Sequence, residues 1–589
     1  MPQPPRKRVK AQGKDSLIIS LDFGTTYSGV SYAFSSEPDR VYTIVHWPGN
    51  SGQSAPKTPT TIAYDLDSTT SFQWGDQLTF SNKDIIEGLK LLLDPDQEWP
   101  YLLSNDIEAE MQKLPKSVLE VTADYMKAIM NHALAAIEGD SLNPEYVQRR
   151  FEKKFVLTVP AIWSDKAKDQ TLLAAKKAGI SPVELVCESE AAAICALAAM
   201  KDMGLKAGDT FVVCDAGGGT VDLVSYEVKS LEPFQFHALT TPTGGAFGSM
   251  MINKLFEQEV RSVVGGDQEY KALREKDSYR QALVDFNTRI KPSFRGRHDA
   301  VNYVAFHRAG LEDNTAEGLE ANSLALTGEK LFGMFDPIVR QVDRLVSEQM
   351  EMARNEPRQA PEATPGHIKA IILVGGFGSN VYLKSIIEKS NPDIMVIPPI
   401  DAWTAVSKGA VMSKLGIAPI VTATKVEKHY GTKSRRIWKL ETDRGEPKVW
   451  DDLEEINMCR IYQWFIHKNS TFSRDERLTI SLAQTFYGKT PHPSRLNIET
   501  DLLEYDAEYA PEHRPEHEAK DARVRRNCVL KTDLSLVPSR LFIHKKRPSD
   551  YADYVELYFD LVIRNDPSGL LKFSLEVDGV EYSCVDTEY

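Results

Sequence analysis

One pattern occurs twice in the chain, and it constrains the fold more than any other feature. Each copy has an apolar run that ends in an aspartate, a turn of small residues with threonine, and a second apolar run. The first copy covers residues 17–34 around Asp22, and the second covers residues 211–226 around Asp215. The two aspartates lie 193 residues apart (215 − 22). Two strand–turn–strand units of one pattern predict an internal duplication, in which two α/β halves each present one turn to a shared cleft.

A third segment has a related form. An apolar run at residues 368–374 ends in two glycines, and a helical pattern follows over residues 381–388. Helical periodicity also covers residues 118–137 and 165–178, and it covers most of residues 249–350. Strands that alternate with helices in this way predict an α/β fold.

The pattern changes after residue 415, where short alternating runs replace the helices. Five runs separated by turn residues are expected to be strands: residues 460–466, 478–486, 527–536, 554–564 and 571–577. A polar stretch at residues 504–526 is expected to be a loop or a short exposed helix. The predicted parts are therefore a disordered basic arm (1–16), a first α/β half (17–207), a second α/β half (208–415) and a β-rich C-terminal domain (416–589).

The charge balance and the apolar content exclude some classes of function. The 589 residues include 70 Lys and Arg against 84 Asp and Glu, which gives a formal net charge of −14. Because a nucleic-acid site needs a basic face, we expect no nucleic-acid partner. No apolar run approaches the roughly 18 residues that cross a bilayer, so we also expect no membrane partner.

The cysteines and the N-terminus indicate the compartment. Six cysteines without a CxxC pair argue against a disulfide framework and favour a reducing compartment. Residues 1–14 carry five basic side chains and no acidic one, which is typical of a solvated arm and also of a nuclear-import signal. The N-terminus has no apolar signal segment. We therefore expect a cytoplasmic location, with nuclear import as the alternative that the basic arm leaves open.

The two small-residue turns have the composition of a phosphate site. A phosphate needs several converging backbone N–H groups, and a Cβ would block its approach, so glycine and threonine suit such turns. Asp22 and Asp215 end their strands and are expected to hold Mg²⁺, which usually keeps most of its waters. Asp222 lies on the returning strand, where its carboxylate could orient a water for attack on a γ-phosphate.

Other interpretations fit these segments less well. A single glycine-rich hairpin is usually only a turn, but two copies of one pattern and a related third segment make coincidence improbable. The chain has no G-x-x-x-x-G-K-[ST] P-loop, and the third segment lacks the last glycine of a dinucleotide motif. His513-Arg-Pro-Glu-His517 matches the H-x-x-E-H pattern of zinc peptidases. That chemistry needs both histidines on one helix, which Pro515 between them disfavours.

Five motifs together resemble a known family. Asp22-Phe-Gly-Thr-Thr-Tyr-Ser, Val159-Pro-Ala, Glu188-Ser-Glu-Ala-Ala-Ala, Asp215-Ala-Gly-Gly-Gly-Thr-Val-Asp and Leu373-Val-Gly-Gly follow one another as in the ATPase domain of the 70-kDa heat-shock chaperones. The resemblance covers residues 17–415 and is greatest to the divergent heat-shock 70 kDa protein 12 branch. It implies an α/β, two-lobed, actin-like ATPase of duplicated ribonuclease-H-like halves, followed by a smaller β-rich C-terminal domain.

The resemblance also implies roles for residues of this chain. The implied nucleotide-binding residues are Gly24, Thr25, Thr26, Tyr27, Gly217, Gly218, Gly219, Thr220, Gly244, Gly245, Lys291, Gly375, Gly376 and Phe377. The implied catalytic residues are Lys90, Glu188 and Asp222, and the implied metal residues are Asp22 and Asp215, which act through water. For Lys90 an ordinary surface lysine stays the alternative. Pro160 matches a proline thought to relay the nucleotide state to the neighbouring domain.

The chain also departs from the family pattern. The chaperones have Gly-Gly-Glu-Asp where this chain has Gly244-Gly-Ala-Phe, and Glu-x-x-Lys-Arg where it has Thr288-Arg-Ile-Lys-Pro. An arginine has become Ser379, and a late acidic position has become Trp403. The phosphate residues are thus kept while the adenosine contacts are rewritten. After the ATPase there is no pattern for a long lid helix and no Glu-Glu-Val-Asp tail, which argues against peptide clamping under a lid.

These patterns favour one function and leave two others open. The first is an Hsp70-like, chaperone-like protein that binds ATP or ADP with Mg²⁺, hydrolyses ATP weakly and couples this to the C-terminal β domain, where a client or partner protein would bind. The second is a nucleotide-gated scaffold without useful turnover. The third is a small-molecule kinase of the actin-like fold.

Overall fold

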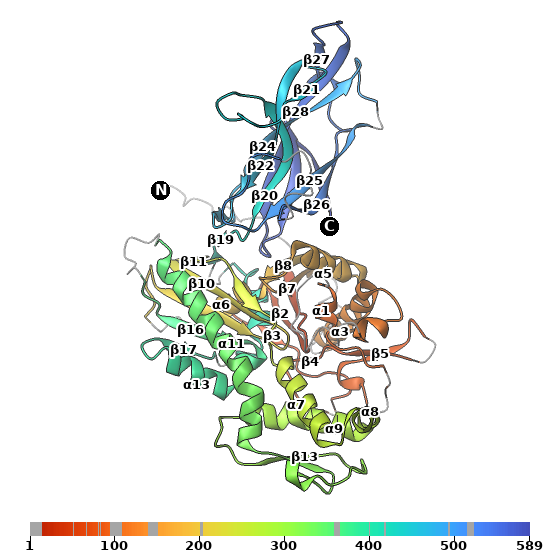
Figure 1. Ribbon diagram of the computed structural model, residues 1–589, viewed down its shortest axis with the longest axis vertical. Helices are drawn as coiled ribbons and strands as arrows, with labels where there is room; N and C mark the ends of the chain where they lie inside the picture. The colour runs from red at the N-terminus through yellow and green to blue at the C-terminus, as the bar shows by residue number, and fades with distance from the viewer. Residues whose placement is uncertain are drawn as a thin grey trace, which may run out of the picture. The chain divides into compact units, whose positions relative to one another are not determined.

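A computed structural model describes residues 15–50, 52–65, 68–79, 82, 84–94, 109–139, 151–200, 204–357, 366–399, 401–416, 420–492, 495–514 and 523–589 (Figure 1). The predicted basic arm lies almost wholly outside these residues. The chain forms two compact units. Unit 1 takes the chain up to Trp163, Gln170–Phe236 and Pro242–Ile420, and unit 2 takes Ser164–Asp169, His237–Thr241 and Val421–Tyr589.

The first sheet of unit 1 has the strand order β3-β2-β1-β7-β8, and β4 also pairs with β2. These strands are β1 (Ser16–Asp22), β2 (Tyr27–Phe34), β3 (Tyr42–Thr43), β4 (Thr58–Pro59), β7 (Glu152–Val159) and β8 (Val183–Cys187). The central strand β1 is buried along its whole length, runs antiparallel to β2 and runs parallel to β7. A continuous apolar run suits such a strand, because both faces of the sheet are covered.

The second sheet repeats this arrangement. It contains the order β17-β16-β9-β10-β11, and β12 also pairs with β10. The strands are β9 (Thr210–Ala216), β10 (Val221–Leu231), β11 (Phe234–Ala238), β12 (Thr243–Gly245), β16 (Ala370–Val374) and β17 (Met395–Ile397). Its buried strand β9 runs antiparallel to β10 and parallel to β16, as β1 does with β2 and β7. The predicted duplication of two α/β halves is confirmed.

The helices of the α/β part are mostly where the periodicity predicts them. They are α1 (Leu89–Leu92), α3 (Val118–Gly139), α5 (Asp165–Lys177), α6 (Glu188–Ala199), α7 (Met250–Val263), α8 (Asp267–Arg274), α9 (Asp277–Asp285), α10 (Lys291–Ser293), α11 (Gly328–Asn355), α12 (Gly375–Gly378), α13 (Val381–Ser390) and α14 (Ala405–Met412). The side chain of Ser164 accepts a hydrogen bond from the Ala167 amide (3.2 Å) at the start of α5, as expected of an N-cap. None of the helices in the described ranges combines the length and apolar character that a bilayer crossing needs.

The mostly helical stretch predicted at residues 249–350 is interrupted by a small sheet. Strands β13 (Asn302–Ala305), β14 (Leu319–Glu320) and β15 (Ser323–Leu326) pair in the order β13-β15-β14. Burial alternates along β15, since Leu324 and Leu326 are buried while their neighbours are partly exposed. A strand of four residues is too short for its period of two to stand out from the helical pattern around it.

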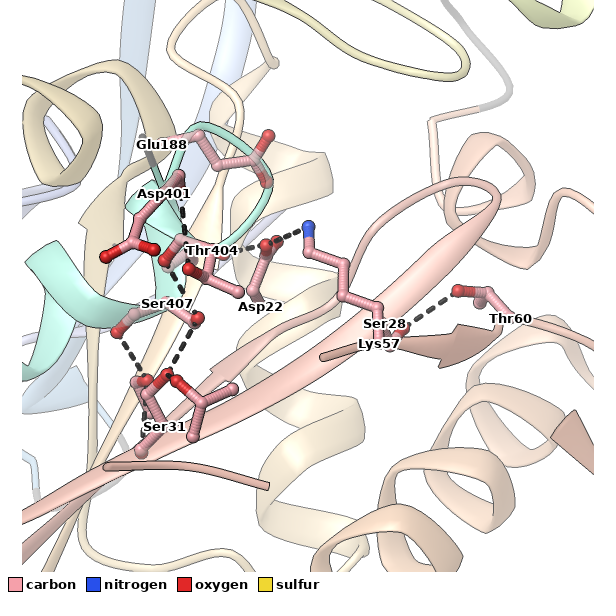
Figure 2. Close-up of polar contacts among 12 residues, drawn as sticks. Asp22, Ser28, Ser31, Lys57, Thr60, Glu188, Asp401, Thr404 and Ser407 are labelled. Carbon is pink, nitrogen blue, oxygen red and sulfur yellow. Dashed lines mark hydrogen bonds and ion pairs between the residues drawn. The ribbon is translucent and has the colours of Figure 1, made fainter. Parts of the chain in front are cut away.

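Helix α14 comes late in the chain but packs on the first sheet and on α6. Small side chains permit this, because a Cβ at Gly409 would lie 1.7 Å from the carbonyl oxygen of Ala191 in α6. Ser20 donates to the Ser407 carbonyl (2.7 Å). The hydroxyls of Ser31 and Ser407 lie 2.9 Å apart (Figure 2). The end of unit 1 is thereby fixed to strands β1 and β2.

Unit 2 contains two antiparallel sheets that share one apolar core. One sheet has the order β21-β22-β20-β25-β26-β31, and the other has β24-β28-β29-β30 with β27 paired to β28. The bounds are β20 (His429–Ile437), β21 (Val449–Asp451), β22 (Ile456–Ile466), β24 (Leu478–Tyr487), β25 (Asn497–Tyr505), β26 (Arg525–Asp533), β27 (Ile543–Lys546), β28 (Asp553–Asn565), β29 (Leu571–Val577), β30 (Val580–Cys584) and β31 (Asp586–Glu588). Leu502 and Leu530 of the first sheet belong to the same buried cluster as Val555 and Leu575 of the second. This is a β-sandwich.

The five predicted C-terminal strands are confirmed as β22, β24, β26, β28 and β29. Sequence patterns missed β20 and β25, whose exposed faces and charged residues hide the alternation. Within the polar stretch 504–526, the ends belong to β25 and β26, residues 506–514 are irregular, and residues 515–522 lie outside the described residues.

The α6–α14 contact gives a test of the fold. Gly409→Ala is expected to lower the free energy of unfolding of unit 1 by about 3 kcal/mol, because the new methyl group meets backbone that cannot move aside. Chemical denaturation combined with hydrogen exchange of β1 and β9 measures this. Gly139→Ala is the matched control, since a Cβ at the exposed end of α3 meets nothing within 4 Å. Equal stability of both variants would contradict the packing.

Candidate functional site

The two repeated turns meet face to face. A Cβ at Gly218 would lie 2.4 Å from Thr26 Oγ1, and a Cβ at Gly219 would lie 2.7 Å from Thr25 Oγ1. Real Cβ atoms do not approach other atoms so closely, so the turn between β9 and β10 needs glycine to lie against the turn between β1 and β2. Gly24 is also required, since its Cβ would lie 2.2 Å from the Tyr27 carbonyl oxygen.

The backbone of the second turn is oriented by the start of α7. The amides of Gly248, Ser249 and Met250 donate to the carbonyls of Gly219 (3.1 Å), Gly217 (3.1 Å) and Gly218 (2.8 Å). In a trans peptide the N–H points opposite to the C=O. The amides that follow these carbonyls, of residues 218–220, therefore point away from α7. Three amides directed to one side form the kind of concavity that binds an anion.

Four carboxylates are buried beside these turns. Asp22 ends β1, Asp215 lies in β9, Asp222 lies directly opposite it in β10, and Glu188 begins α6. Their residues are only 1–8% exposed. Burial raises the pKa of Glu188 to about 8 and that of Asp215 to about 7, and the charges of the neighbouring aspartates add to both shifts. Burial also raises the pKa of Asp222, although the Ile162 amide donates to it (3.3 Å).

Two buried lysines face these acids. Lys90 of α1 is 4% exposed, so it is not a surface lysine; its ammonium contacts Glu188 and lies 5.5 Å from the centre of the Trp163 ring. Lys57 donates to Asp22 Oδ2 at 2.6 Å (Figure 2). Sequence reasoning missed Lys57, because it lies in a polar stretch before β4 with no motif around it. Thr158 of β7, also missed, donates to the other Asp22 oxygen (3.4 Å).

The charges of this cluster suit a divalent cation. Four carboxylates against two ammonium groups leave two negative charges when all six groups are ionised. Uncompensated buried charge is unfavourable, and it accounts for the raised pKa values of the acids. Carboxylate oxygens are also the donors that Mg²⁺ prefers, either directly or through its waters. The residues therefore fit Mg²⁺, with Asp22 and Asp215 at the strand ends as the groups that would hold it.

The third glycine segment, which begins at Gly375, lies against Asp215 of the second half. Gly375 has a φ of +82°, and a Cβ there would lie 2.4 Å from Asp215 Oδ1. A Cβ at Gly376 would lie 3.6 Å from Trp403 Nε1, and Phe377 is buried. Trp403 also contacts Tyr27 edge to face, with 5.7 Å between the ring centres. A partly exposed indole thus stands between the first turn and the third segment.

Other predicted residues lie at the margin of this cluster. Gly244 and Gly245 of β12 pair with Asp222 and Val221 of β10. Lys291 lies beside α7 instead of the carboxylates, where it donates to Asn253 Oδ1 (2.9 Å) and to the Ser249 carbonyl (3.5 Å). Burial lowers the pKa of Lys291 to about 7. The amide of the same Ser249 donates to the Gly217 carbonyl, so Ser249 links Lys291 to the glycine turn.

A duplicated α/β fold whose two glycine turns meet beside buried acids defines the class of actin-like ATPases. Comparison with known proteins gives the family: the family described as Hsp70 protein matches residues 18–390. The chain belongs to the Hsp70 family.

The similar curated proteins place it in a divergent part of that family. It is 24% identical to heat shock 70 kDa protein 12A of Homo sapiens over 506 residues, which cover 70% of this chain and 71% of that protein. It is 24% identical to heat shock 70 kDa protein 12B of Homo sapiens over 519 residues, which cover 72% of each. It is 25% identical to chaperone protein HscA of Proteus mirabilis over 264 residues, which cover 42% of this chain and 38% of that protein.

The pKa of Asp215 predicts how stability depends on pH without metal. Its carboxyl titrates near 3.8 when unfolded and near 7 when folded, so the metal-free protein loses stability as pH rises from about 4 to about 7. Asp215→Asn removes this loss and is expected to be about 4 kcal/mol more stable than the wild type at pH 8. The difference should vanish below pH 4.

Denaturation in the presence of a chelator, at several pH values, measures this difference. Asp393→Asn, at an exposed residue of unit 1, is the control and should follow the wild type throughout. If Asp215→Asn were the less stable protein at pH 8, the assigned charge imbalance would be wrong.

Proposed function

We propose that this protein binds Mg·ATP between the two glycine turns of unit 1 and hydrolyses it slowly in a chaperone-like cycle. One observation carries the proposal: three amides directed to one side lie beside a cluster of acids. When all its groups are ionised, that cluster has two uncompensated negative charges. The amides of residues 218–220 and the hydroxyls of Thr25 and Thr26 would bind the β- and γ-phosphates. Bound Mg²⁺ would neutralise phosphate charge that develops during transfer.

The buried acids supply the groups for hydrolysis. Asp222 of β10 accepts a hydrogen bond from the Ile162 amide. This bond fixes the direction of its carboxylate, which could therefore orient a water. Burial raises the pKa of Glu188 to about 8, so it could accept a proton from that water only once a bound cation favours its ionised form. Without nucleotide, however, Lys90 and Glu188 pair with each other. Because this pair must open before either group acts on a water or a phosphate, we infer slow turnover.

The same ion pair favours a second candidate, a nucleotide-gated scaffold. If Lys90 and Glu188 stay paired when nucleotide binds, the turns still bind phosphate but no proton acceptor reaches the water. ATP would then change the shape of unit 1 without being consumed.

The proposal also couples the nucleotide state of unit 1 to unit 2. The relatives described above include a heat shock 70 kDa protein and a chaperone protein. We propose that the nucleotide state of unit 1 alters the exposure of residues near 415–430, where unit 1 gives way to unit 2, and that unit 2 carries the surface for a client or partner protein.

Binding is tested by thermal stability. Mg·ATP at 100 times its Kd should stabilise unit 1 by about 2.7 kcal/mol and raise its melting temperature. Gly218→Asp should abolish the shift, because its Cβ would clash with Thr26 and its carboxylate would bring a negative charge to the proposed phosphate site. Gly333→Ala, on the exposed face of α11 with nothing within 4 Å of the new Cβ, should keep the shift. No shift in the wild type would overturn the nucleotide proposal.

Turnover separates the ATPase from the scaffold. Single-turnover phosphate release should fall at least about 10-fold in Asp222→Asn and in Glu188→Gln, while Mg·ATP still raises the melting temperature. Asp393→Asn serves as the control at an exposed carboxylate. Hydrolysis that neither substitution reduces would exclude catalysis by this site. Wild-type release at the level of buffer alone, with ATP binding intact, would favour the scaffold.

A further inference from the structure

Unit 2 contains a group of metal-ligating side chains that the proposed ATPase does not use. Asp443 follows β20, Cys459 lies in β22, and His513 lies in the irregular segment after β25. One carboxylate oxygen, the Sγ atom and one ring nitrogen all lie within 4.8 Å of one another. Across the part of the chain that the structure describes, this is the one group of three such side chains that meets this distance limit.

The local backbone holds the three side chains in place. Lys439 donates its amide to Asp443 Oδ2 (2.8 Å), and Asp443 donates its amide to the Lys439 carbonyl (2.8 Å), so the turn after β20 fixes the carboxylate. His513 forms a β-bridge with Ile461. On either side of it, the Glu512 carbonyl accepts from the Tyr462 amide (2.8 Å), and the Arg514 amide donates to the Arg460 carbonyl (3.1 Å).

The group of three side chains is exposed to solvent only at His513. The Asp443 side chain is 0% exposed and Cys459 is 1% exposed, whereas the His513 side chain is 24% exposed. His513 Nε2 lies 3.0 Å from Asp443 Oδ1. The interior therefore presents oxygen and sulfur donors, and solvent can reach the site past the imidazole. Three protein ligands and one accessible position form an open tetrahedral site.

An arginine now lies where a cation would bind. Arg436 Nη2 donates to Asp443 Oδ1 and also lies 3.4 Å from His513 Nε2. One ring nitrogen cannot both donate to the carboxylate and accept from the guanidinium, so one of these two contacts is unmet in any tautomer. Arg436 Nε is in addition buried with no hydrogen-bond partner among the described residues. The guanidinium fits this place imperfectly.

The charges balance if a divalent metal replaces that guanidinium contact. A divalent cation, a thiolate, a carboxylate and a neutral imidazole sum to zero. Arg436 keeps an acidic partner, because its Nη1 already contacts Glu512. The Cys459 proton leaves to solvent on binding, since a metal binds the thiolate. Ligands about 2.0–2.3 Å from a tetrahedral metal lie roughly 3.5 Å apart, so the three side chains need to converge by about 1 Å.

We propose that unit 2 binds one Zn²⁺ through Asp443, Cys459 and His513, with a water at the fourth position. Sulfur, nitrogen and oxygen donors together select zinc over Mg²⁺ or Ca²⁺, which prefer oxygen alone. The ion ties the turn after β20 and the segment around His513 to β22. His513 belongs to the H-x-x-E-H pattern, but it reaches this site from a β-bridge and with ligands from elsewhere in the chain, so the site is unrelated to the helical zinc-peptidase arrangement.

The test uses the full-length, untagged protein after treatment with a chelator. Titration with Zn²⁺ should give one equivalent bound and slower hydrogen exchange at residues 438–446 and 512–514. Co²⁺ used in place of Zn²⁺ should produce the thiolate charge-transfer absorption of a cysteine-ligated site. Cys459→Ser should remove that absorption and weaken Zn²⁺ binding at least about 100-fold. Cys528→Ser, at a cysteine equally buried in β26, should change neither.

Two further variants keep the outcome clear if Cys459→Ser folds poorly. His513→Gln, at the most exposed ligand, should lose Zn²⁺ affinity but keep the fold. Arg436→Gln should bind Zn²⁺ at least as tightly as the wild type, because the competing cation is gone. Uptake well below one equivalent in the wild type, or a Co²⁺ absorption that survives Cys459→Ser, would overturn the proposal and leave the Arg436–Asp443–His513 contacts as an ion-pair network only.

Discussion

The proposed nucleotide site depends on one constraint: the glycines of one turn lie so close to the threonines of the other that neither glycine has room for a Cβ. Gly218 and Gly219 lie directly against Thr26 and Thr25, so amides from one half and hydroxyls from the other face the same small volume. Each turn follows the buried central strand of its sheet, β1 in the first half and β9 in the second. Helix α14 packs on the first sheet and on α6, which Gly409 permits by its lack of a side chain.

The buried charge beside those turns links the fold to its chemistry. Asp215 and Glu188 have raised pKa values because burial and their acidic neighbours disfavour ionisation, and two lysines compensate only part of that charge. A cluster of this kind costs stability unless a cation joins it. Unit 2 has a comparable but smaller cluster, in which Arg436 serves as the cation beside Asp443 and meets the neighbouring histidine imperfectly. In both clusters a divalent metal would balance the charges better than the present lysines or arginine do.

The local patterns account for most of the elements and for few of the contacts. Continuous apolar runs predicted β1, β9 and β16, because strands buried on both faces need them. Helical periodicity predicted α3 and α13, yet it concealed the short strands β13 to β15. In unit 2, the strands with clear alternation were predicted, whereas β20 and β25 were not, because charged residues such as Arg435 and Glu499 fall within them.

The sequence by itself determined the duplication, the two glycine turns and the positions of Asp22, Asp215, Asp222 and Glu188, because each belongs to a motif of a few neighbouring residues. Only the tertiary structure brought Lys57 to Asp22, since the lysine belongs to no motif and its partner lies 35 residues away. The zinc-type group of unit 2 arises in the same way. Its three ligands come from three separate segments of the chain, and the pairing of strands in the sandwich brings them within reach of one another.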